Sequence, residues 1–376
     1  MGELYLKKEV RYMNILKSLA IISVVLGHCG FPYASVIYSY HMALFFFING
    51  YFFKEEYVCK PKKFLMKKIR SLYVPFIVYE FIFIILRNAL ISIKVYNETQ
   101  INPISNFMGY LGAFKNAVIF RYTGDSMLGT FWFLTVLFFV NILFLIIKLV
   151  WKKVKIQNKY IQFSIIFMVY ILGFYLLKEG LNINDFLNPW NNKFLRLIIN
   201  YLFDIRVLIF LMIYYLGHLY NKYEDRILIN IYFSIMFLGV LYYLRGTWID
   251  TSVYSFKSPL YFGAVSIMGI YFNIYIAKKL SRFKLGLLNY IGTNSFIIMT
   301  FHLLVFKIVS YMGIKYYNLQ IERLSDYPAI FMGGYWWILY TLIGVLIPIL
   351  IKYSIETLKR KIKSSYGYIE IKNTSV

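Results

Sequence analysis

The sequence is poor in acidic residues, in cysteine and in charge of either sign. Only 17 of its 376 residues are Asp or Glu, two are Cys, and 15% are charged, whereas 60% are hydrophobic and 21% are aromatic. So low a charge content excludes a soluble domain of ordinary composition. Because long stretches carry hardly any charge, we expect the apolar core to be shared with a lipid bilayer.

The two cysteines, Cys29 and Cys59, lie in a predicted membrane span and in a predicted cytoplasmic loop. They cannot meet in an oxidising compartment, so no disulfide is expected. No group of cysteines and histidines has the spacing of a metal site, and no metal is expected. The sequence predicts no cleavable signal peptide, internal repeat or second soluble domain. We therefore expect one transmembrane domain over residues 1–376, with 372–376 as a disordered tail.

Ten apolar stretches have about the length that an α-helix needs to cross the hydrocarbon core, which is ~20 residues. The second of them is short. They predict an all-α integral membrane protein with about ten transmembrane helices. The predicted spans are residues 13–31, 38–53, 72–92, 130–149, 160–177, 197–217, 228–244, 258–277, 286–306 and 334–354.

The basic residues lie mainly on one side of these spans. The formal net charge is +24, which on a soluble protein would suggest nucleic acid as a partner. Here 27 of the 41 lysine and arginine residues fall in the termini and in the alternate loops that share their side, and 11 fall in the opposite loops. The positive-inside rule therefore predicts that both termini are cytoplasmic. The expected partner is the lipid bilayer, and no nucleic acid is expected.

Ionisable side chains inside predicted spans are candidates for function, because each costs roughly 2.5–3.5 kcal/mol to insert. His218 is interpreted as an interfacial imidazole and Trp132 as an interfacial aromatic anchor. Asp204 and Arg206 are two residues apart, so we expect them to face different sides of one helix and to pair with other helices. The other candidates are Lys17, His28, His41, Glu80, Arg87 and His302.

The first span, "RYMNILKSLAIISVVLGHCG", carries a cation and an imidazole on one face. Lys17 and His28 are eleven residues apart, close to three helical turns, which separates them by about 16 Å along the axis. A neutral imidazole can accept a proton from a hydroxyl or attack an activated acyl group. The alternative is a structural histidine bonded to a neighbouring helix. The predicted stripe on this face begins at Asn14 and also contains Ser18, Ile21 and Val25.

The second span, "YHMALFFFINGYFF", places His41 near its outer end. Because the connection from 31 to 40 is short, the first two spans are antiparallel neighbours, and His28 and His41 are expected at similar depths. His41, or an amide such as Asn49 or Asn294, is a candidate donor to the oxyanion of an acyl-transfer reaction.

The following loop ends in "KKIRSLYVPF", with Lys67, Lys68 and Arg70 close together. These residues are interpreted either as an ordinary positive-inside anchor or as a site for the phosphates of an anionic nucleotide carrier.

Taken in order, these segments resemble the acyltransferase 3 family of membrane acyltransferases. "NILKSLAIISVVLGH" is similar to its first helix, and "YHMALFFFINGYFF" to its second motif in a form typical of fucose-4-O-acetylase-like members. "KKIRSLYVPF", "TFWFLTVLF" and "LNYIGTNSFIIMTFH" resemble later signatures. Asn14, Ala43 and Asn49 stand where the family usually carries an acid, Pro and Ser. Glu80 is therefore a candidate to pair with Lys17 in place of the missing acid.

The resemblance implies transfer of an acyl group, usually acetyl, from cytoplasmic acyl-CoA to a hydroxyl of an extracytoplasmic glycan or lipid-linked saccharide. Acyl-CoA is expected as a co-substrate, with no permanently bound cofactor, and a bacterial inner membrane is the expected location. The phosphates would bind Lys17, Lys68 and Arg70, and His28 would be catalytic. Supporting or pocket residues would be Asn14, His41, Asn49, Glu80, Arg206, Asn294 and His302.

Two other interpretations stay open. A transporter or flippase for a lipid-linked saccharide would also place ionisable residues in the membrane, although matching Gly- or Pro-interrupted helices in the two halves are not evident. An inactive family member is the second, because Asn14 replaces the usual acid. Acceptor specificity is expected in the long outer loops, 93–129 and 307–333.

Overall fold

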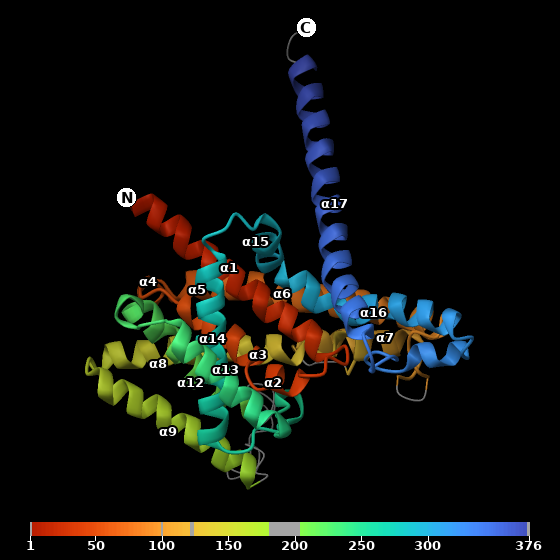
Figure 1. The fold of residues 1–376 in the computed structure, drawn as a ribbon. Helices are drawn as coiled ribbons and strands as arrows, with labels where there is room; N and C mark the ends of the chain where they lie inside the picture. The colour runs from red at the N-terminus through yellow and green to blue at the C-terminus, as the bar shows by residue number, and fades with distance from the viewer. Residues whose placement is uncertain (1, 99–100, 121–123, 180–203, 374–376) are drawn as a thin grey trace.

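The computed structural model describes residues 2–98, 101–120, 124–179 and 204–373, and over these residues it contains helices and no strands. Figure 1 shows the arrangement. The α-helices are α1 (Gly2–Gly27), α2 (Ala34–Tyr38), α3 (His41–Tyr51), α4 (Glu56–Cys59), α5 (Pro61–Lys68), α6 (Val74–Ser92), α7 (Phe107–Val118), α8 (Trp132–Lys153), α9 (Lys159–Lys178), α12 (Arg206–Tyr223), α13 (Ile231–Tyr243), α14 (Pro259–Leu280), α15 (Gly286–Thr293), α16 (Ser295–Tyr316) and α17 (Trp336–Asn373).

Short helical turns of other types connect them. A π-helical turn, η1 (Ile69–Tyr73), joins α5 to α6 without a break, and the remaining turns are 3-10 helices. These are η2 (Ser126–Leu128), η3 (Glu224–Arg226), η4 (Leu244–Gly246), η5 (Thr251–Val253) and η6 (Ile321–Ser325).

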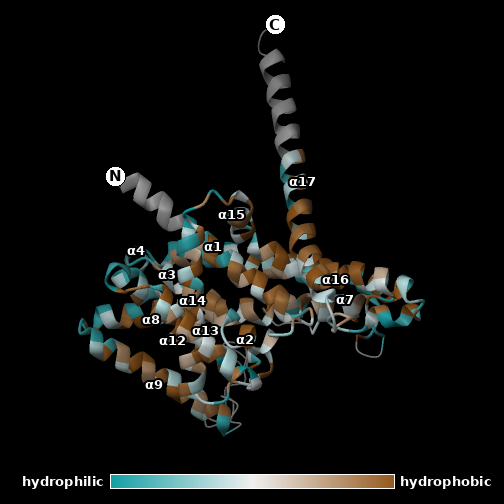
Figure 2. Cartoon of the chain, in the orientation of Figure 1, coloured by the Kyte–Doolittle hydropathy of each residue, from teal (hydrophilic) through white to brown (hydrophobic). Residues whose placement is uncertain are grey.

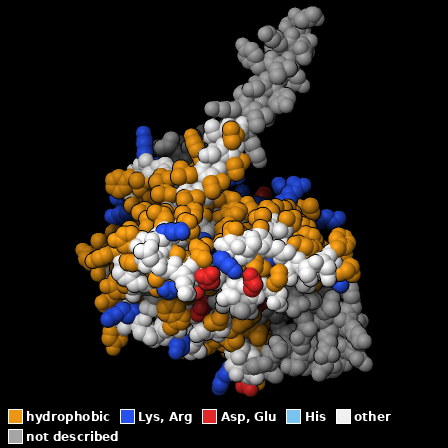
Figure 3. Space-filling model, turned by 90° about the vertical axis from the view of Figure 1, so that its right-hand side faces the viewer, with side chains coloured by type: hydrophobic (Ala, Val, Ile, Leu, Met, Phe, Trp, Pro, Cys, Tyr) orange, Lys and Arg blue, Asp and Glu red, His pale blue; other side chains and the backbone are white. Residues whose placement is uncertain are grey.

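Among the described residues, six helical segments are long and apolar enough to cross a membrane, so the chain is a multi-pass membrane protein. Hydrophobic residues dominate the helical body (Figure 2) and cover much of the face seen in Figure 3. The prediction of about ten spans is confirmed only for these six, because the helices at the other four positions, α1, α3, α12 and α13, do not meet both requirements over the described residues. The six are Pro61–Ser92, Trp132–Lys153, Lys159–Lys178, Pro259–Leu280, Ser295–Tyr316 and Trp336–Leu358.

One predicted boundary is wrong for a local reason. The span expected at 286–306 is divided, because α15 ends at Thr293 and α16 begins at Ser295, with Asn294 turning between them. The disordered tail expected at 372–376 stays a prediction, because helix α17 runs to Asn373 and residues 374–376 lie outside the described part of the chain. Residues 197–203 of the predicted sixth span lie outside it as well.

Helix α3 packs against α12, α1 and α14, and two glycines let it approach α12 closely. A methyl group on Gly50 would lie 1.8 Å from the carbonyl oxygen of Tyr214, and one on Gly217 would lie 2.0 Å from that of Phe47. Only glycine allows backbones so close, as is common between helices in membranes. Because α3 packs against three helices, His41 at its start is held by several neighbours.

The ends of the chain leave the body together. In Figure 1 the N-terminal end of α1 and the far end of α17 extend from the same side of the helical body. That the termini share one side of the membrane stays a prediction. That this side is cytoplasmic stays a prediction from the charge distribution.

Candidate functional site

A pocket of about 70 Å³ lies where the end of α1 meets α2, α3, α8 and the segments on the predicted outer side. His28 follows directly after α1, Tyr38 ends α2 and His41 begins α3. These three residues line the pocket together with Trp132, Asp250, Ser252 and Tyr327. The polar groups thus converge from segments up to three hundred residues apart in the sequence.

The imidazoles of His28, His41 and His302 form one group of rings. The ring centroids of His28 and His302 are 5.5 Å apart. Tyr38 lies on the other side, 6.2 Å from the His28 ring and 4.9 Å from the His41 ring. The structure therefore places His28 and His41 on one pocket, with His302 directly behind His28.

Backbone hydrogen bonds determine which nitrogen of two of these rings carries the proton. His41 Nδ1 lies 2.9 Å from the Ile37 carbonyl oxygen, and His302 Nδ1 lies 3.0 Å from the Ile298 oxygen. A carbonyl oxygen only accepts, so we assign the proton of each neutral ring to Nδ1 and a lone pair to Nε2. His28 has no such bond within the described residues and lies partly open to the pocket. It is the imidazole best placed to take up a proton from a reactant.

Asp250 lies opposite the histidines in the loop between α13 and α14. Its Oδ1 accepts hydrogen bonds from the Ser252 backbone N–H at 2.9 Å and from the Ser252 hydroxyl at 2.5 Å. The carboxylate lies close enough to act electrostatically on His28 and Tyr38. Burial and Asp250 together raise the pKa of Tyr327 to about 12, so its hydroxyl remains a donor at neutral pH.

Arg206 supports the wall that carries Asp250. Its guanidinium lies 4.3 Å from the ring centres of Trp132 and Tyr254, between two aromatic faces. Its Nη1 donates to the carbonyl oxygens of Thr251 and Ser252, at 3.2 and 3.0 Å. These contacts hold the loop against α8 and shape the pocket from behind.

Asp204 pairs with Arg206 itself, at 2.9 Å between Nε and both carboxylate oxygens, so the prediction of separate partners on other helices is wrong. Helix α12 begins only at Arg206, which leaves Asp204 outside the helical spacing on which that prediction relied. Trp132, expected as an interfacial anchor, instead lines the pocket beneath Arg206. His218, expected at the interface, is buried with Nε2 3.2 Å from Glu55 Oε1.

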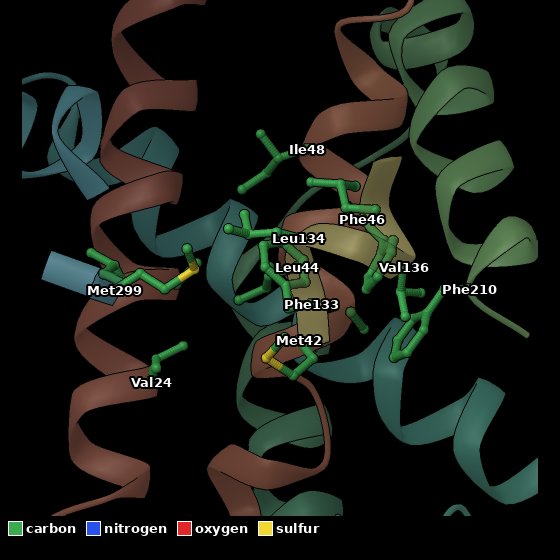
Figure 4. Close-up of a cluster of buried hydrophobic side chains, with 14 of the residues drawn as sticks. Val24, Met42, Leu44, Phe46, Ile48, Phe133, Leu134, Val136, Phe210 and Met299 are labelled. Carbon is green, nitrogen blue, oxygen red and sulfur yellow. The ribbon is translucent and has the colours of Figure 1, made fainter. Parts of the chain in front are cut away.

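The floor of the pocket is apolar. Val24, Met42 and Met299 line it, and Figure 4 shows them beside a larger cluster of buried hydrophobic side chains. The predicted stripe is corrected here, because Ile21 and Val25 are fully buried in packing and Val24 is the residue that reaches the pocket. The pocket does not extend to Lys17 of α1 or to the lysines of α5.

Those lysines form a second group, at the predicted inner end of the same helices. Lys17 Nζ lies 4.7 Å from the centre of the Phe52 ring, and Lys68 Nζ lies 3.4 Å from Asn49 Oδ1. Lys67 donates to the Tyr57 hydroxyl at 3.0 Å and lies close enough to Lys17 and Lys68 for mutual repulsion. Among the described residues, none of the three forms an ion pair with an acidic side chain. Lys17, Lys67 and Lys68, called here the lysine cluster, can therefore bind an anion.

The other predicted site residues lie away from both groups or at their edges. Arg70 is exposed on η1. Asn14 donates to Asn289 Oδ1 at 3.0 Å and ties α1 to α15. Asn294 donates to the Tyr290 carbonyl oxygen at 2.9 Å and does not line the pocket, so it is poorly placed as an oxyanion donor.

Asn49 likewise bonds the Phe45 carbonyl oxygen and Lys68, away from the pocket. Glu80 is fully buried in α6. The ion pairs of the described chain do not include one between Glu80 and Lys17. Of the suggested oxyanion donors, His41 alone lines the pocket.

Sequence reasoning missed several polar residues of the pocket, among them Tyr38, Asp250 and Tyr327. Tyr38 was detectable, because it lies one helical turn before His41 in a segment already singled out. Asp250 is an acid directly after "GTWI" in a loop between apolar spans, which is a weak signal. Tyr327 has no such signal in the sequence, because only the tertiary structure of its loop brings it to the pocket.

Comparison with known proteins gives one match. The model of the acyltransferase 3 family, which describes an acyltransferase domain, matches residues 10–353, nearly the whole chain. No curated protein and no solved structure matches.

Proposed function

Because the chain belongs to the acyltransferase 3 family, we propose that it is a membrane O-acetyltransferase. It takes the acetyl group from acetyl-CoA at the cytoplasmic face and transfers it to a hydroxyl of a cell-envelope or exported glycan. The observation that carries the proposal is a partly open imidazole, His28, directly after α1, together with the lysine cluster around Lys17 of the same helix, which forms no ion pair with an acid within the described residues. The match identifies no branch, so the fucose-4-O-acetylase-like assignment stays a prediction.

The lysine cluster is the proposed site of the CoA phosphates. Three ammonium groups that have no acidic partner among the described residues repel one another, and a multiply charged phosphate ligand relieves that repulsion. The pantetheine arm then follows the face of α1 from Lys17 past Val24 to His28, over about 16 Å. Because an apolar floor separates the two groups of residues, Met42 and Met299 must shift to admit the thioester, which their flexible side chains allow.

His28 is the proposed general base. The acceptor hydroxyl enters from the side of Asp250 and Tyr327 and gives its proton to His28 as its oxygen attacks the thioester carbonyl carbon. The carbon–sulfur bond breaks, and the thiolate of CoA takes up the proton from the His28 imidazolium. Negative charge on the carbonyl oxygen during attack is stabilised by donors such as the Tyr38 or Tyr327 hydroxyl.

A two-step route is the alternative for the same residue. His28 itself attacks the thioester and releases CoA, and the acceptor hydroxyl then discharges the acetyl-imidazole. A reaction that is stopped before acceptor is added distinguishes the routes. Labelled acetyl on His28 supports the two-step route, whereas unlabelled enzyme supports direct transfer.

The test of the function uses purified protein in liposomes with radiolabelled acetyl-CoA. We expect CoA release and acetyl incorporation into glycan from the source envelope, and their loss in His28→Ala with folding and insertion retained. Normal transfer by His28→Ala would remove His28 from the site. A protein that binds acetyl-CoA without turnover would be an inactive member, and one that moves a lipid-linked saccharide without acetyl transfer would be a flippase.

A further inference from the structure

A second site lies on α14, remote from the imidazoles, where an apolar groove continues into a basic pocket. The groove has a volume of about 370 Å³ and is lined by apolar and aromatic side chains that include Leu216 and Ile270. The basic pocket has about 330 Å³ and is lined by Asn230, Lys279 and Arg282, among others. Ile229 lines both, so the two form one continuous surface.

The order of residues along α14 matches the order of chemical groups in a membrane lipid. Ile267, Ile270 and Ile274 face the groove, and Lys278, Lys279 and Arg282 follow in the basic pocket. From Ile267 to Lys279 the helix rises by about 18 Å, and Arg282 lies in the turn directly after α14. One leaflet has about 15 Å of hydrocarbon plus its polar headgroups, so this length suits a lipid with its phosphate at Arg282.

The site is preformed, and two of its basic side chains are not neutralised by an acid within the described chain. The Tyr271 hydroxyl donates to the Leu228 carbonyl oxygen at 2.9 Å and accepts from the Asn230 backbone N–H at 3.0 Å, which fixes the loop against α14. Lys278 is neutralised by Glu224, at 2.7 Å. Lys279 and Arg282 are exposed, and neither forms an ion pair within the described chain.

We propose that an anionic glycerophospholipid of the inner leaflet binds here, with its phosphate at Lys279 and Arg282 and an acyl chain in the groove lined by Leu216 and Ile270. Without the groove, Lys279 and Arg282 would be ordinary basic residues on the cytoplasmic side, as the positive-inside rule predicts. Their continuity with an apolar groove instead favours a molecule that is both anionic and lipidic. The proposal does not depend on the acetyltransferase activity.

The test compares wild-type protein with Lys279→Gln/Arg282→Gln, and with Lys152→Gln/Lys153→Gln as a control that removes two exposed basic residues at the end of α8. Binding of phosphatidylglycerol, of phosphatidylcholine with the same chains, and of glycerol 3-phosphate is measured by native mass spectrometry and by thermal stabilisation. Two basic residues near an anionic surface predict a loss of about thirtyfold in phosphatidylglycerol affinity for the first variant.

We expect the control to keep wild-type affinity and phosphatidylcholine binding to change little in either variant. Leu216→Trp, which fills the groove, should weaken phosphatidylglycerol binding without removing a charge. An equal loss of phosphatidylglycerol affinity in the two charge variants would mean that the basic surface as a whole attracts the lipid, and it would overturn the proposal of a specific site. Binding of glycerol 3-phosphate as tight as that of the lipid would assign the pocket to a free phosphate compound and overturn the proposal.

Discussion

Neutralising Lys68 tests the donor site most quantitatively. Its ammonium lies 3.4 Å from Asn49 Oδ1 and 5.3 Å from the centre of the Phe64 ring, with no ion pair to an acid among the described residues. A hydrogen bond between charged groups contributes about 1.5–3 kcal/mol. Because the phosphates lie far from the reacting carbon, Lys68→Gln removes this contribution equally from the ground state and the transition state.

We therefore expect Lys68→Gln to raise KM for acetyl-CoA by about tenfold to a hundredfold with little change in kcat. The assay is acetyl transfer in proteoliposomes over a range of acetyl-CoA concentrations. Acetyl-pantetheine, which lacks the nucleotide phosphates, provides the internal comparison, because variant and wild type should use it equally well. Lys153→Gln, a basic residue near the end of α8 outside the lysine cluster, is the matched control.

Two results would refute this reasoning. An unchanged KM in Lys68→Gln would mean that the phosphates bind elsewhere. An equal rise in Lys153→Gln would mean that the surface charge as a whole attracts acetyl-CoA and that the lysine cluster has no special role.

Three further predictions concern the pocket wall, the pocket floor and the inner surface. Arg206→Ala should lower the free energy of unfolding by about 2–3 kcal/mol, because it leaves Asp204 without its cationic partner. In thermal unfolding, the double variant with Asp204→Ala should be less destabilised than the sum of the two single variants. Destabilisations that add fully would contradict the pairing. Met299→Trp should slow acetyl transfer by about a hundredfold, because the larger side chain blocks the passage of the pantetheine arm through the pocket floor. The volume-conserving Met299→Leu should keep the wild-type rate. Equal transfer rates for the two variants in kinetic assays would exclude a path of the arm past Met299. Hydrogen bonds from His218 and Lys148 lower the pKa of Glu55 to about 2 from 4.5, so its stabilising effect is present above pH 4.5 and is lost as pH falls towards 2. The wild type should therefore exceed Glu55→Gln in melting temperature at neutral pH, and this margin should shrink in acid; a margin independent of pH would exclude the linkage.

The sequence predicted much of the membrane fold because apolar length is a local property. The positions of α6, α8 and α14 followed from uninterrupted hydrophobic stretches. The packing of the short helix α3 could not be predicted, because its position depends on the close approach of Gly50 to α12. The break at Asn294 was missed because hydropathy does not register a change of helix axis.

In the candidate site, too, the residues in apolar segments were predicted and those in loops were not. His28 and His41 were found because both lie within apolar segments, where an imidazole is conspicuous. Asp250 and Tyr327 were missed because they lie in loops, where polar residues are common and only tertiary structure selects those that face the pocket. The pairing of Asp204 with Arg206 was missed because helical spacing was applied to a residue that precedes the helix.

The central claim is that one carrier molecule extends from the lysine cluster to His28. A cryo-electron microscopy structure of the protein in nanodiscs, with a non-transferable thioether analogue of acetyl-CoA, tests it most directly. We predict phosphate density beside Lys17 and Lys68 and the acyl end of the analogue within reach of the His28 imidazole. An analogue whose acyl end stays on the cytoplasmic side of Val24 and Met299, with the pocket floor closed, would contradict the account.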